Sequence, residues 1–267
     1  MWLKRVYDVP EVVMFEKVNV KEINPHVFLL DESGESTGYL VVGKEKAVVI
    51  DTMNGEEDLQ ALVRTITQLP VMVINTHGHC DHVTGNAYFE EAWIHPDDLE
   101  LAKTHMNFDG IVEFYKEKGL KILPFHFVQD GEIIDLGGCS LEVISLPGHT
   151  HGGILLLLKE DRILFTGDSI NRHLWMQLED SLPMEVFAEN LDKIMYLKDE
   201  ADIILHGHTQ SADAISLLVD LRTGVQEILD GKVQEDKPYH WFGGEDKQHV
   251  YCNGKVICYK ESNVFLK

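Results

Sequence analysis

The sequence predicts an α/β (α+β) protein folded as a four-layer αββα sandwich. Short apolar runs typical of strands alternate with segments of helical periodicity along most of the chain, and the strand-like runs form two groups separated by helices. A chain of 267 residues with 44% hydrophobic residues is long enough to bury a full core. We therefore expect one main domain over residues 1–235, with residues 236–267 as a C-terminal β-hairpin extension of the same domain.

The first half of the chain supplies the first sheet and several helices. Apolar residues recur at helical spacing in residues 57–69, which indicates a helix packed on a sheet. Pro96 followed by two aspartates indicates a further helix start. Residues 104–120 form either a wall of a substrate cleft or an ordinary packed helix, and packing is the favoured interpretation. Strands are predicted at residues 12–18, 26–30, 39–43, 46–51, 93–94 and in the run that begins at residue 71.

The second half repeats this alternation. Residues 154–158 are apolar without a break, which indicates a strand buried on both faces. The pair Asn253-Gly254 between two strand-like runs is the usual sequence signal of a β-hairpin. The aromatic residues just before this hairpin either cover the site as a lid or anchor the hairpin, and anchoring is favoured. Further strands are predicted at residues 125–128, 132–136, 140–146, 162–165 and 202–205, and helices at 183–198 and 211–229.

The stretch from Val71 to Asn86 carries the strongest chemical signal in the chain. An apolar run ends in a loop that holds three histidines and an aspartate. Loops at the carboxyl ends of strands are where α/β sheets place binding residues, and several such polar groups are costly to bury unpaired. Imidazole and carboxylate groups suit zinc, iron or manganese. The loop therefore predicts a metal site, and a chance excess of histidine is the less favoured alternative.

This loop resembles a known signature. The run His77-Gly-His79-Cys-Asp81-His82, trailed by Gly-Asn, is similar to the H-x-H-x-D-H motif of the metallo-β-lactamase superfamily of binuclear metallohydrolases. Three further motifs follow in the order of that family, centred on His149, Asp168 and His208, and residues 39–51 resemble its opening strand pair. The resemblance covers the chain from about residue 25 to residue 210 and implies the metallo-β-lactamase fold.

The resemblance also implies a set of metal ligands. One ion would be held by His77, His79 and His149, a second by Asp81, His82 and His208, and Asp168 would bridge them. Two divalent ions are implied, with zinc expected and iron or manganese as alternatives. A hydroxide that bridges the two ions would be the nucleophile, and Asp81 would be the catalytic residue that orients it and accepts its proton.

Other residues compete for these roles. In the stretch His206-Gly-His the family pattern favours the second histidine as ligand and leaves the first for outer contacts or packing. His151 is expected outside the ligand set, and His173 is expected to line the cleft. Cys80 is expected to point away from the metals into packing. The remaining histidines, His105 among them, are assigned surface or packing roles by default.

The residue at the bridging position discriminates among reactions. Members that hydrolyse antibiotics usually carry cysteine or serine there, whereas thioesterases, lactonases and phosphodiesterases carry aspartate, so Asp168 favours thioesterase- or lactonase-type members over true β-lactamases. The resemblance therefore implies hydrolysis of a small ester, thioester or lactone. Arg172, Trp175 and Met176 are expected as cleft walls. The alternatives are an iron-dependent redox enzyme similar to sulfur dioxygenases and a β-lactamase.

The charge of the chain restricts its partners. A formal charge of −22 repels phosphate backbones and acidic membrane surfaces, so we expect a small-molecule substrate, no nucleic acid and no membrane. The N-terminus lacks the apolar core of a secretory signal, and the four cysteines show no C-x-x-C pairing. Both features indicate a cytoplasmic protein. The substrate, the native metal and the oligomeric state are not specified by the sequence, and a homodimer is one option.

Overall fold

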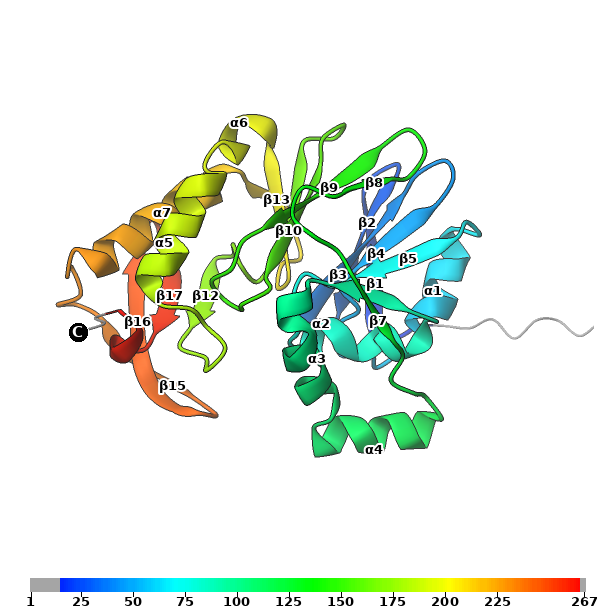
Figure 1. The fold of residues 1–267 in the computed structure, drawn as a ribbon, viewed down its shortest axis with the longest axis horizontal. Helices are drawn as coiled ribbons and strands as arrows, with labels where there is room; N and C mark the ends of the chain where they lie inside the picture. The colour runs from blue at the N-terminus through cyan, green and yellow to red at the C-terminus, as the bar shows by residue number, and fades with distance from the viewer. Residues whose placement is uncertain (1–14, 265–267) are drawn as a thin grey trace, which may run out of the picture.

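The computed structural model describes residues 15–264, and two β-sheets packed face to face form its centre (Figure 1). Helices α1 (Leu59–Ile66), α2 (Cys80–Val83), α3 (Leu99–Met106) and α4 (Asp109–Lys118) lie on the side of the first sheet. Helices α5 (Met184–Ile194), α6 (Leu197–Glu200) and α7 (Ser216–Leu229) lie on the side of the second. The predicted αββα arrangement is therefore confirmed.

The first sheet has seven strands in the order in which they follow along the chain. The first four strands pair antiparallel, and the pairs from β4 to β7 are parallel. A strand was predicted at residues 12–18, of which residues 12–14 lie outside the described residues. For residues 15–17 the prediction is wrong, because the first strand begins at Val18. The residues of this first strand after Val18 are largely exposed, so burial does not alternate from one residue of the strand to the next. The strands are β1 (Val18–Asn24), β2 (Val27–Glu32), β3 (Ser36–Val42), β4 (Ala47–Ile50), β5 (Val71–Ile74), β6 (Ala92–Ile94) and β7 (Phe125–Phe127).

The second sheet has six strands in the order β14-β13-β11-β10-β9-β8. All five residues of β10 are buried, as the unbroken apolar run predicts. Leu155 and Leu157 pack toward the helices, whereas Leu156 packs toward the first sheet. The strands are β8 (Ile133–Asp135), β9 (Ser140–Ser145), β10 (Ile154–Leu158), β11 (Ile163–Gly167), β13 (Ile203–His206) and β14 (Asp213–Ala214).

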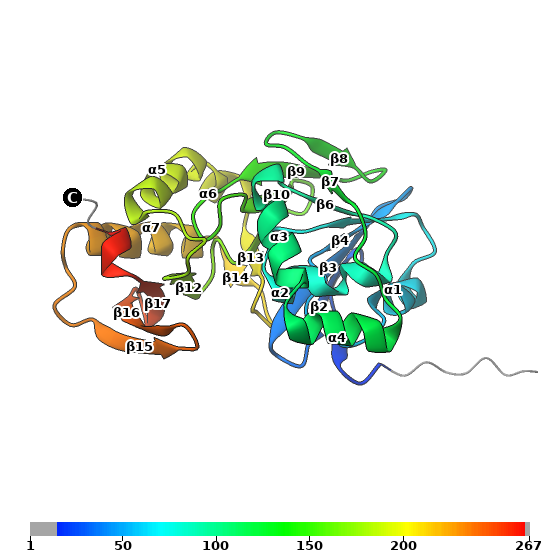
Figure 2. The same ribbon diagram turned by 60° about the horizontal axis from the view of Figure 1, so that its bottom comes forward.

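A third sheet of four strands contains the C-terminal segment, in the order β12-β17-β16-β15. It consists of β12 (His173–Met176), β15 (Lys237–Trp241), β16 (Gly244–Tyr251) and β17 (Lys255–Tyr259). The predicted hairpin is present as β16 and β17, with Asn253 and Gly254 at φ angles of 64° and 86° in its turn. Strand β12 pairs parallel with β17, which ties the extension to the body of the protein and supports anchoring. Figures 1 and 2 both place this sheet at one end of the molecule, beside α7.

Two helix boundaries differ from the prediction. The helix expected over 183–198 is divided into α5 and α6. The helix expected from residue 211 begins only at Ser216, because Asp213 and Ala214 pair with β13 as a short strand. Short 3₁₀ helices occur at Thr84–Tyr88, Pro96–Asp98 and Glu261–Asn263. No helix in residues 15–264 is long and apolar enough to cross a membrane.

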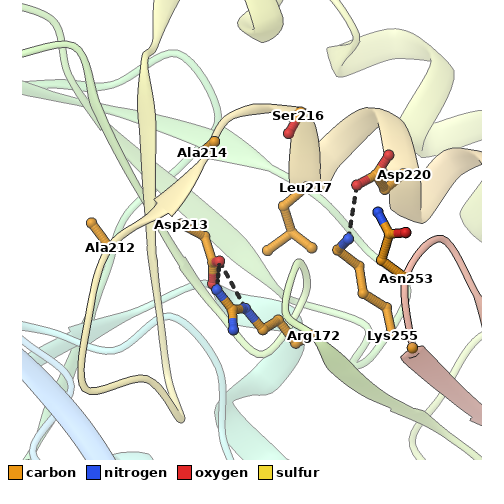
Figure 3. A pocket seen from close by; sticks show the side chains of 10 residues that line it. Arg172, Ala212, Asp213, Ala214, Ser216, Leu217, Asp220, Asn253 and Lys255 are labelled. Carbon is orange, nitrogen blue, oxygen red and sulfur yellow. Dashed lines mark hydrogen bonds and ion pairs between the residues drawn. The ribbon is translucent and has the colours of Figure 1, made fainter.

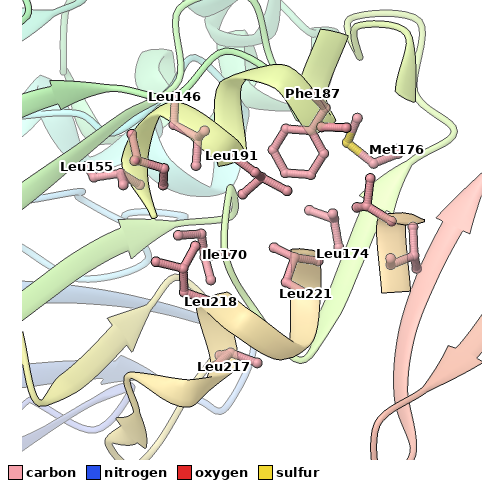
Figure 4. Close-up of a cluster of buried hydrophobic side chains, with 14 of the residues drawn as sticks. Leu146, Leu155, Ile170, Leu174, Met176, Phe187, Leu191, Leu217, Leu218 and Leu221 are labelled. Carbon is pink, nitrogen blue, oxygen red and sulfur yellow. The ribbon is translucent and has the colours of Figure 1, made fainter. Parts of the chain in front are cut away.

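The core lies in layers on both faces of the two central sheets. One cluster fills the space between the sheets, and it includes Leu29, Val41, Leu156 and Phe165. A second cluster joins the outer face of the second sheet to α5, α7 and the third sheet; Leu155, Leu174, Phe187 and Leu221 meet there (Figure 4). Burial of these side chains contributes on the order of 1.5–3 kcal/mol each. Strand β12 is thus packed into the core as well as paired in a sheet.

Candidate metal centre

The loop after β5 is held by a carboxylate at the end of β4. Asp51 accepts hydrogen bonds from the backbone N–H and the hydroxyl of Thr76, both at 2.7 Å, and from Nδ1 of His82 at 2.9 Å. Because Asp51 is buried, these contacts fix the loop and the orientation of the His82 ring together. The predicted loop therefore enters the site in one defined conformation.

All seven ligand candidates lie close together. Donor atoms of His77, His79 and His149 lie within 4.8 Å of one another, and so do those of Asp81, His82 and His208; we call these groups site 1 and site 2. Asp168 lies between the two groups. Its Oδ2 atom is 3.0 Å from Nε2 of His208 and 3.8 Å from Nε2 of His149, and its Oδ1 atom is 3.6 Å from Nε2 of His82.

Several donor atoms in this cluster are buried without a partner. Nε2 of His77, Nε2 of His82 and Oδ1 of Asp168 make no hydrogen bond within the described part of the chain. A buried polar atom left in this state costs about 1–3 kcal/mol, so it is rare unless a further group binds it. Imidazole nitrogen and carboxylate oxygen suit divalent ions such as zinc, iron or manganese. The donor set therefore fits metal ions at this position.

Most of the imidazole rings are fixed by a contact to their other nitrogen. Nδ1 of His149 lies 2.6 Å from the carbonyl oxygen of Trp175, and Nδ1 of His208 lies 2.7 Å from that of Glu35. Nδ1 of His77 lies 3.1 Å from the hydroxyl of Thr76. Such contacts determine which nitrogen carries the proton and leave Nε2 free to bind a metal.

The two sites differ in protonation. Burial, together with the neighbouring histidines, holds the pKa of His77 well below its usual range and lowers that of His149 to about 4. Burial also opposes protonation of His208, but the carboxylates of Asp168 and Asp81 outweigh it and raise the pKa to about 9. The pKa of Asp168 falls well below its usual value because His208 and His82 outweigh the effect of burial. In the metal-free protein at neutral pH, His77 and His149 are therefore uncharged, whereas His208 and Asp168 form an ion pair.

Three residues near the centre were not identified from the sequence. Asp98 is fully buried and accepts hydrogen bonds from Gly78 N at 2.9 Å and from the Thr150 hydroxyl at 2.7 Å, so it joins the loops of both halves. His105 stacks on His79, with ring centroids 5.0 Å apart, so it has the packing role that was one of its two default assignments, and the ring it packs on belongs to a ligand candidate. Oδ2 of Asp180 lies 3.6 Å from Nε2 of His79.

The competing candidates lie outside the seven-residue cluster. His206 is buried and faces Oδ2 of Asp213 at 3.3 Å, and His151 is exposed. Cys80 belongs to no candidate metal group among residues 15–264. The expectation that Met176 forms a cleft wall is wrong, because its side chain is buried in the core between β12 and the helices.

A hollow of about 290 Å³ adjoins the cluster and has His208 on its wall, together with Arg172, His173 and Trp175. The Trp175 ring lies 5.1 Å from that of His208 and stacks on His173. Arg172, His173 and Trp175 therefore line this hollow as expected.

A larger hollow of about 490 Å³ lies beyond Arg172 (Figure 3). Its two basic side chains are paired, Arg172 with Asp213 and Lys255 with Asp220. This hollow has balanced charge, and none of the seven ligand candidates lies on its wall. Of these two hollows, the smaller one has a ligand candidate on its wall.

Two packed sheets with helices outside them, and a buried histidine–aspartate cluster at the ends of their strands, define a metal-binding protein of the αββα class. The family model described as "Metallo-beta-lactamase superfamily" matches residues 33–226. The chain belongs to this superfamily.

Similarity to individual proteins is lower. Over 182 residues the chain is 27% identical to the acyl-coenzyme A thioesterase MBLAC2 of Homo sapiens. The aligned region covers 56% of this chain and 65% of that protein. It is 31% identical over 203 residues to the beta-lactamase-like protein 2 homolog of Caenorhabditis elegans, and the aligned region covers 74% of this chain and 62% of that protein. It is 28% identical over 144 residues to a hydroxyacylglutathione hydrolase of Francisella tularensis, and the aligned region covers 54% of this chain and 50% of that protein. The matched region is thus about half to two thirds of each relative's length.

Solved structures share the fold. A metallo-beta-lactamase from Pontibacter korlensis aligns with a TM-score of 0.59 and 21% identity, covering 78% of this chain and 99% of that one. The stereoselective inverting sec-alkylsulfatase Pisa1 from Pseudomonas sp. aligns with a TM-score of 0.64 and 14% identity, covering 81% and 42%. At these identities the likeness shows the fold alone.

Proposed function

We propose that this protein is a metal-dependent hydrolase that cleaves a small thioester, ester or lactone with the help of two metal ions. The observation that carries the proposal is the convergence of seven donor residues into two groups, with Asp168 between them. Site 1 would hold one ion through His77, His79 and His149. Site 2 would hold the other through Asp81, His82 and His208, and Asp168 would be shared.

The metals and the protein have separate tasks in this proposal. When bound, two divalent ions supply Lewis acidity toward the carbonyl group and lower the pKa of water enough for hydroxide to form at neutral pH. Asp81 is the residue we assign to orient the attacking water between the sites and to accept its proton. Its Oδ2 atom lies 3.4 Å from Nε2 of His208, and its side chain is 29% exposed, so it is in reach of both the cluster and solvent.

A thioester is the first substrate class to test. Acyl-coenzyme A and hydroxyacylglutathione, which appear in the names of two relatives, both carry an acyl group on sulfur. The stacked rings of Trp175 and His173 beside His208 offer an aromatic wall for the substrate in the adjoining hollow. The charge of −22 disfavours nucleic acid as substrate. We propose residues 1–235 as the catalytic domain and 236–267 as its extension.

The experiment combines metal analysis with a substrate screen. Protein purified without chelator should contain close to two ions per chain, and zinc is the expected element. The metal-loaded protein should hydrolyse at least one member of a panel of acyl-coenzyme A, acylglutathione, aryl ester, lactone and β-lactam compounds. One ion or none under metal-replete conditions contradicts the two-metal assignment. Oxygen consumption with a sulfur substrate by iron-loaded protein, without hydrolysis, would favour the redox alternative.

A further inference from the structure

Strand β12 and the segment that joins it to α5 contact site 1 from outside. The carbonyl oxygen of Trp175 lies 2.6 Å from Nδ1 of His149, and the hydroxyl of Ser181 donates a hydrogen bond to the His149 carbonyl at 3.0 Å. The backbone N–H of Leu182 donates to the carbonyl of Gly148 at 2.8 Å. Strand β12 therefore holds the ring of one site 1 histidine, and the segment after it holds the backbone.

The same segment places a carboxylate beside a second site 1 histidine. Nδ1 of His79 is turned toward the cluster and lies 3.1 Å from Nε2 of His149. Nε2 of His79 is buried and makes no hydrogen bond with any described residue. Oδ2 of Asp180 lies 3.6 Å from that nitrogen. A small inward movement of Asp180 would bring the two atoms to hydrogen-bond distance.

A third metal ion held by His79, His105 and Asp180 is the competing interpretation, because their donor atoms also lie within 4.8 Å of one another. Chemistry disfavours it. A neutral imidazole that binds a metal through Nδ1 keeps its proton on Nε2, so a second metal there requires loss of both ring protons. In addition, Nδ1 of His105 already accepts a hydrogen bond from Cys80 N at 3.1 Å. A carboxylate that accepts the Nε2 proton fits this geometry better.

We propose that Asp180 is a positioning residue for site 1: its carboxylate accepts the Nε2–H of His79 and thereby directs Nδ1 toward the metal. Ligating histidines commonly donate their second N–H to a carboxylate, which fixes the ring and raises its basicity. The inference rests on the proposed metal centre and adds to it the residue that sets the affinity of one site. Strand β12, just before Asp180, is held by β17, so the C-terminal extension supports this contact.

The neighbouring residue supplies a matched control. Glu179 lies in the same loop and carries the same charge, but its side chain is 90% exposed and its carboxylate pairs with Lys260. The substitution Glu179→Gln removes one negative charge at nearly the same place without touching His79. A difference between variants at 179 and 180 therefore reports the contact with His79 and not the loss of charge.

The experiment measures metal affinity and histidine tautomer in the full-length protein. Zinc is titrated against a chromophoric chelator for the wild type, Asp180→Ala, Asp180→Asn and Glu179→Gln, and circular dichroism checks that each metal-free variant is folded. Asp180→Ala should weaken one of the two zinc ions by about 10–100-fold and leave the other within about threefold. Asp180→Asn should lose less, because its amide oxygen still accepts a hydrogen bond, and Glu179→Gln should match the wild type.

The second readout does not depend on metal or turnover. Long-range ¹H–¹⁵N spectra of the metal-free wild type should show His79 with its proton on Nε2, and Asp180→Ala should shift that tautomer population.

Several results would overturn the assignment. Unchanged affinities together with an unchanged tautomer exclude it, and equal weakening at both sites indicates a general structural role. A third zinc ion lost in both Asp180→Ala and His105→Ala supports the competing metal site. Absence of hydrolytic activity bears on the proposed function alone, because zinc affinity and tautomer are measured without substrate.

Discussion

The two halves of the candidate metal centre are supported by different parts of the molecule. At site 2, the ring of His82 is held by Asp51 at the end of β4, and the ring of His208 by the carbonyl of Glu35 in the turn before β3. At site 1, the ring of His149 is held by the carbonyl of Trp175 in β12, and Asp180 just after β12 faces His79. The outer contacts of His82 and His208 at site 2 therefore come from the first sheet, whereas those of His149 and His79 at site 1 come from β12 and the loop after it. His77, the third histidine of site 1, contacts Thr76 beside the first sheet.

The sites also differ in charge. The pKa of His149 is lowered to about 4 by burial and by His79, whereas the carboxylates around His208 raise its pKa to about 9 against the effect of burial. His149 thus presents a neutral nitrogen donor at site 1, whereas His208 at site 2 must lose a proton before it can bind an ion. One continuous cluster therefore combines a histidine that is neutral at pH 7 with a histidine that is protonated at pH 7.

Replacement of Asp168 by alanine tests whether the two sites are separable, and we expect the largest effect here. Asp168 lies between both groups, so its loss should weaken metal binding by more than about 100-fold, mainly at site 2, where fewer histidines remain. Elemental analysis after dialysis against limiting zinc would report this as close to one ion per chain. Retention of two ions would remove Asp168 from the shared position.

Replacement of Asp81 by asparagine separates ligation from catalysis at site 2. The amide keeps the shape of the side chain but binds a metal weakly and cannot accept a proton. We expect turnover to fall by at least about 10²-fold, the low end of the contribution of a positioned base. Initial rates must be compared at matched metal content, and His79→Ala is the site 1 counterpart. A rate within a few-fold of the wild type would assign proton transfer to another group.

Proton release on metal binding should distinguish the sites directly. At pH 7 His208, with a pKa of about 9, is protonated in the metal-free protein, so filling site 2 should release a proton and its affinity should rise with pH toward 9. His149, whose pKa is about 4, is already neutral above about pH 5, so it should release no proton when site 1 fills. Calorimetric titrations with zinc in buffers of different ionisation enthalpy measure the protons released at each step. Release of equal numbers of protons at both sites would contradict the proposed difference in histidine protonation.

The metal-free protein should show the corresponding dependence of stability on pH. The pKa of folded His208, about 9, lies above its usual value of 6.5. The stabilisation from its pairing with Asp168 is therefore complete below about pH 6.5 and is lost as pH rises through about 9. The midpoint of urea unfolding of chelator-treated protein should fall over this interval. His208→Gln should remove most of that fall.

The smallest effect is expected at Cys80, which lies in the loop shared by both sites but belongs to neither donor group. Burial raises the pKa of its thiol, so the nucleophilic thiolate is disfavoured at neutral pH. Cys80→Ala should change the free energy of unfolding by about 1 kcal/mol or less, because the side chain is only half-buried, and leave turnover nearly unchanged. Loss of activity with both metals retained would mean that the thiol participates.

The sequence by itself determined which residues are candidate ligands and that the chain forms an αββα sandwich. Four of the seven candidates lie within the six residues from His77 to His82, where the local pattern alone predicts a metal site. Each of the others follows an apolar strand and was identified through the resemblance of its motif to the metallo-β-lactamase superfamily. The helix and strand periods depend only on neighbouring residues, and burial of β10 on both faces could be read from five consecutive apolar residues.

Only the tertiary structure decided how these ligands are held. Asp51 contacts His82 from 31 residues away, and Asp98 contacts Thr150 from 52 residues away, so no local pattern marks either aspartate. Strand β12 escaped prediction because it is four residues long and is stabilised by β17, which lies more than 80 residues later along the chain. The packing that places Asp180 beside His79, removes Met176 from the cleft and stacks His105 on His79 forms only when the sheets assemble. Ligand identity is a property of local sequence, whereas the environment of each ligand arises from contacts between distant segments.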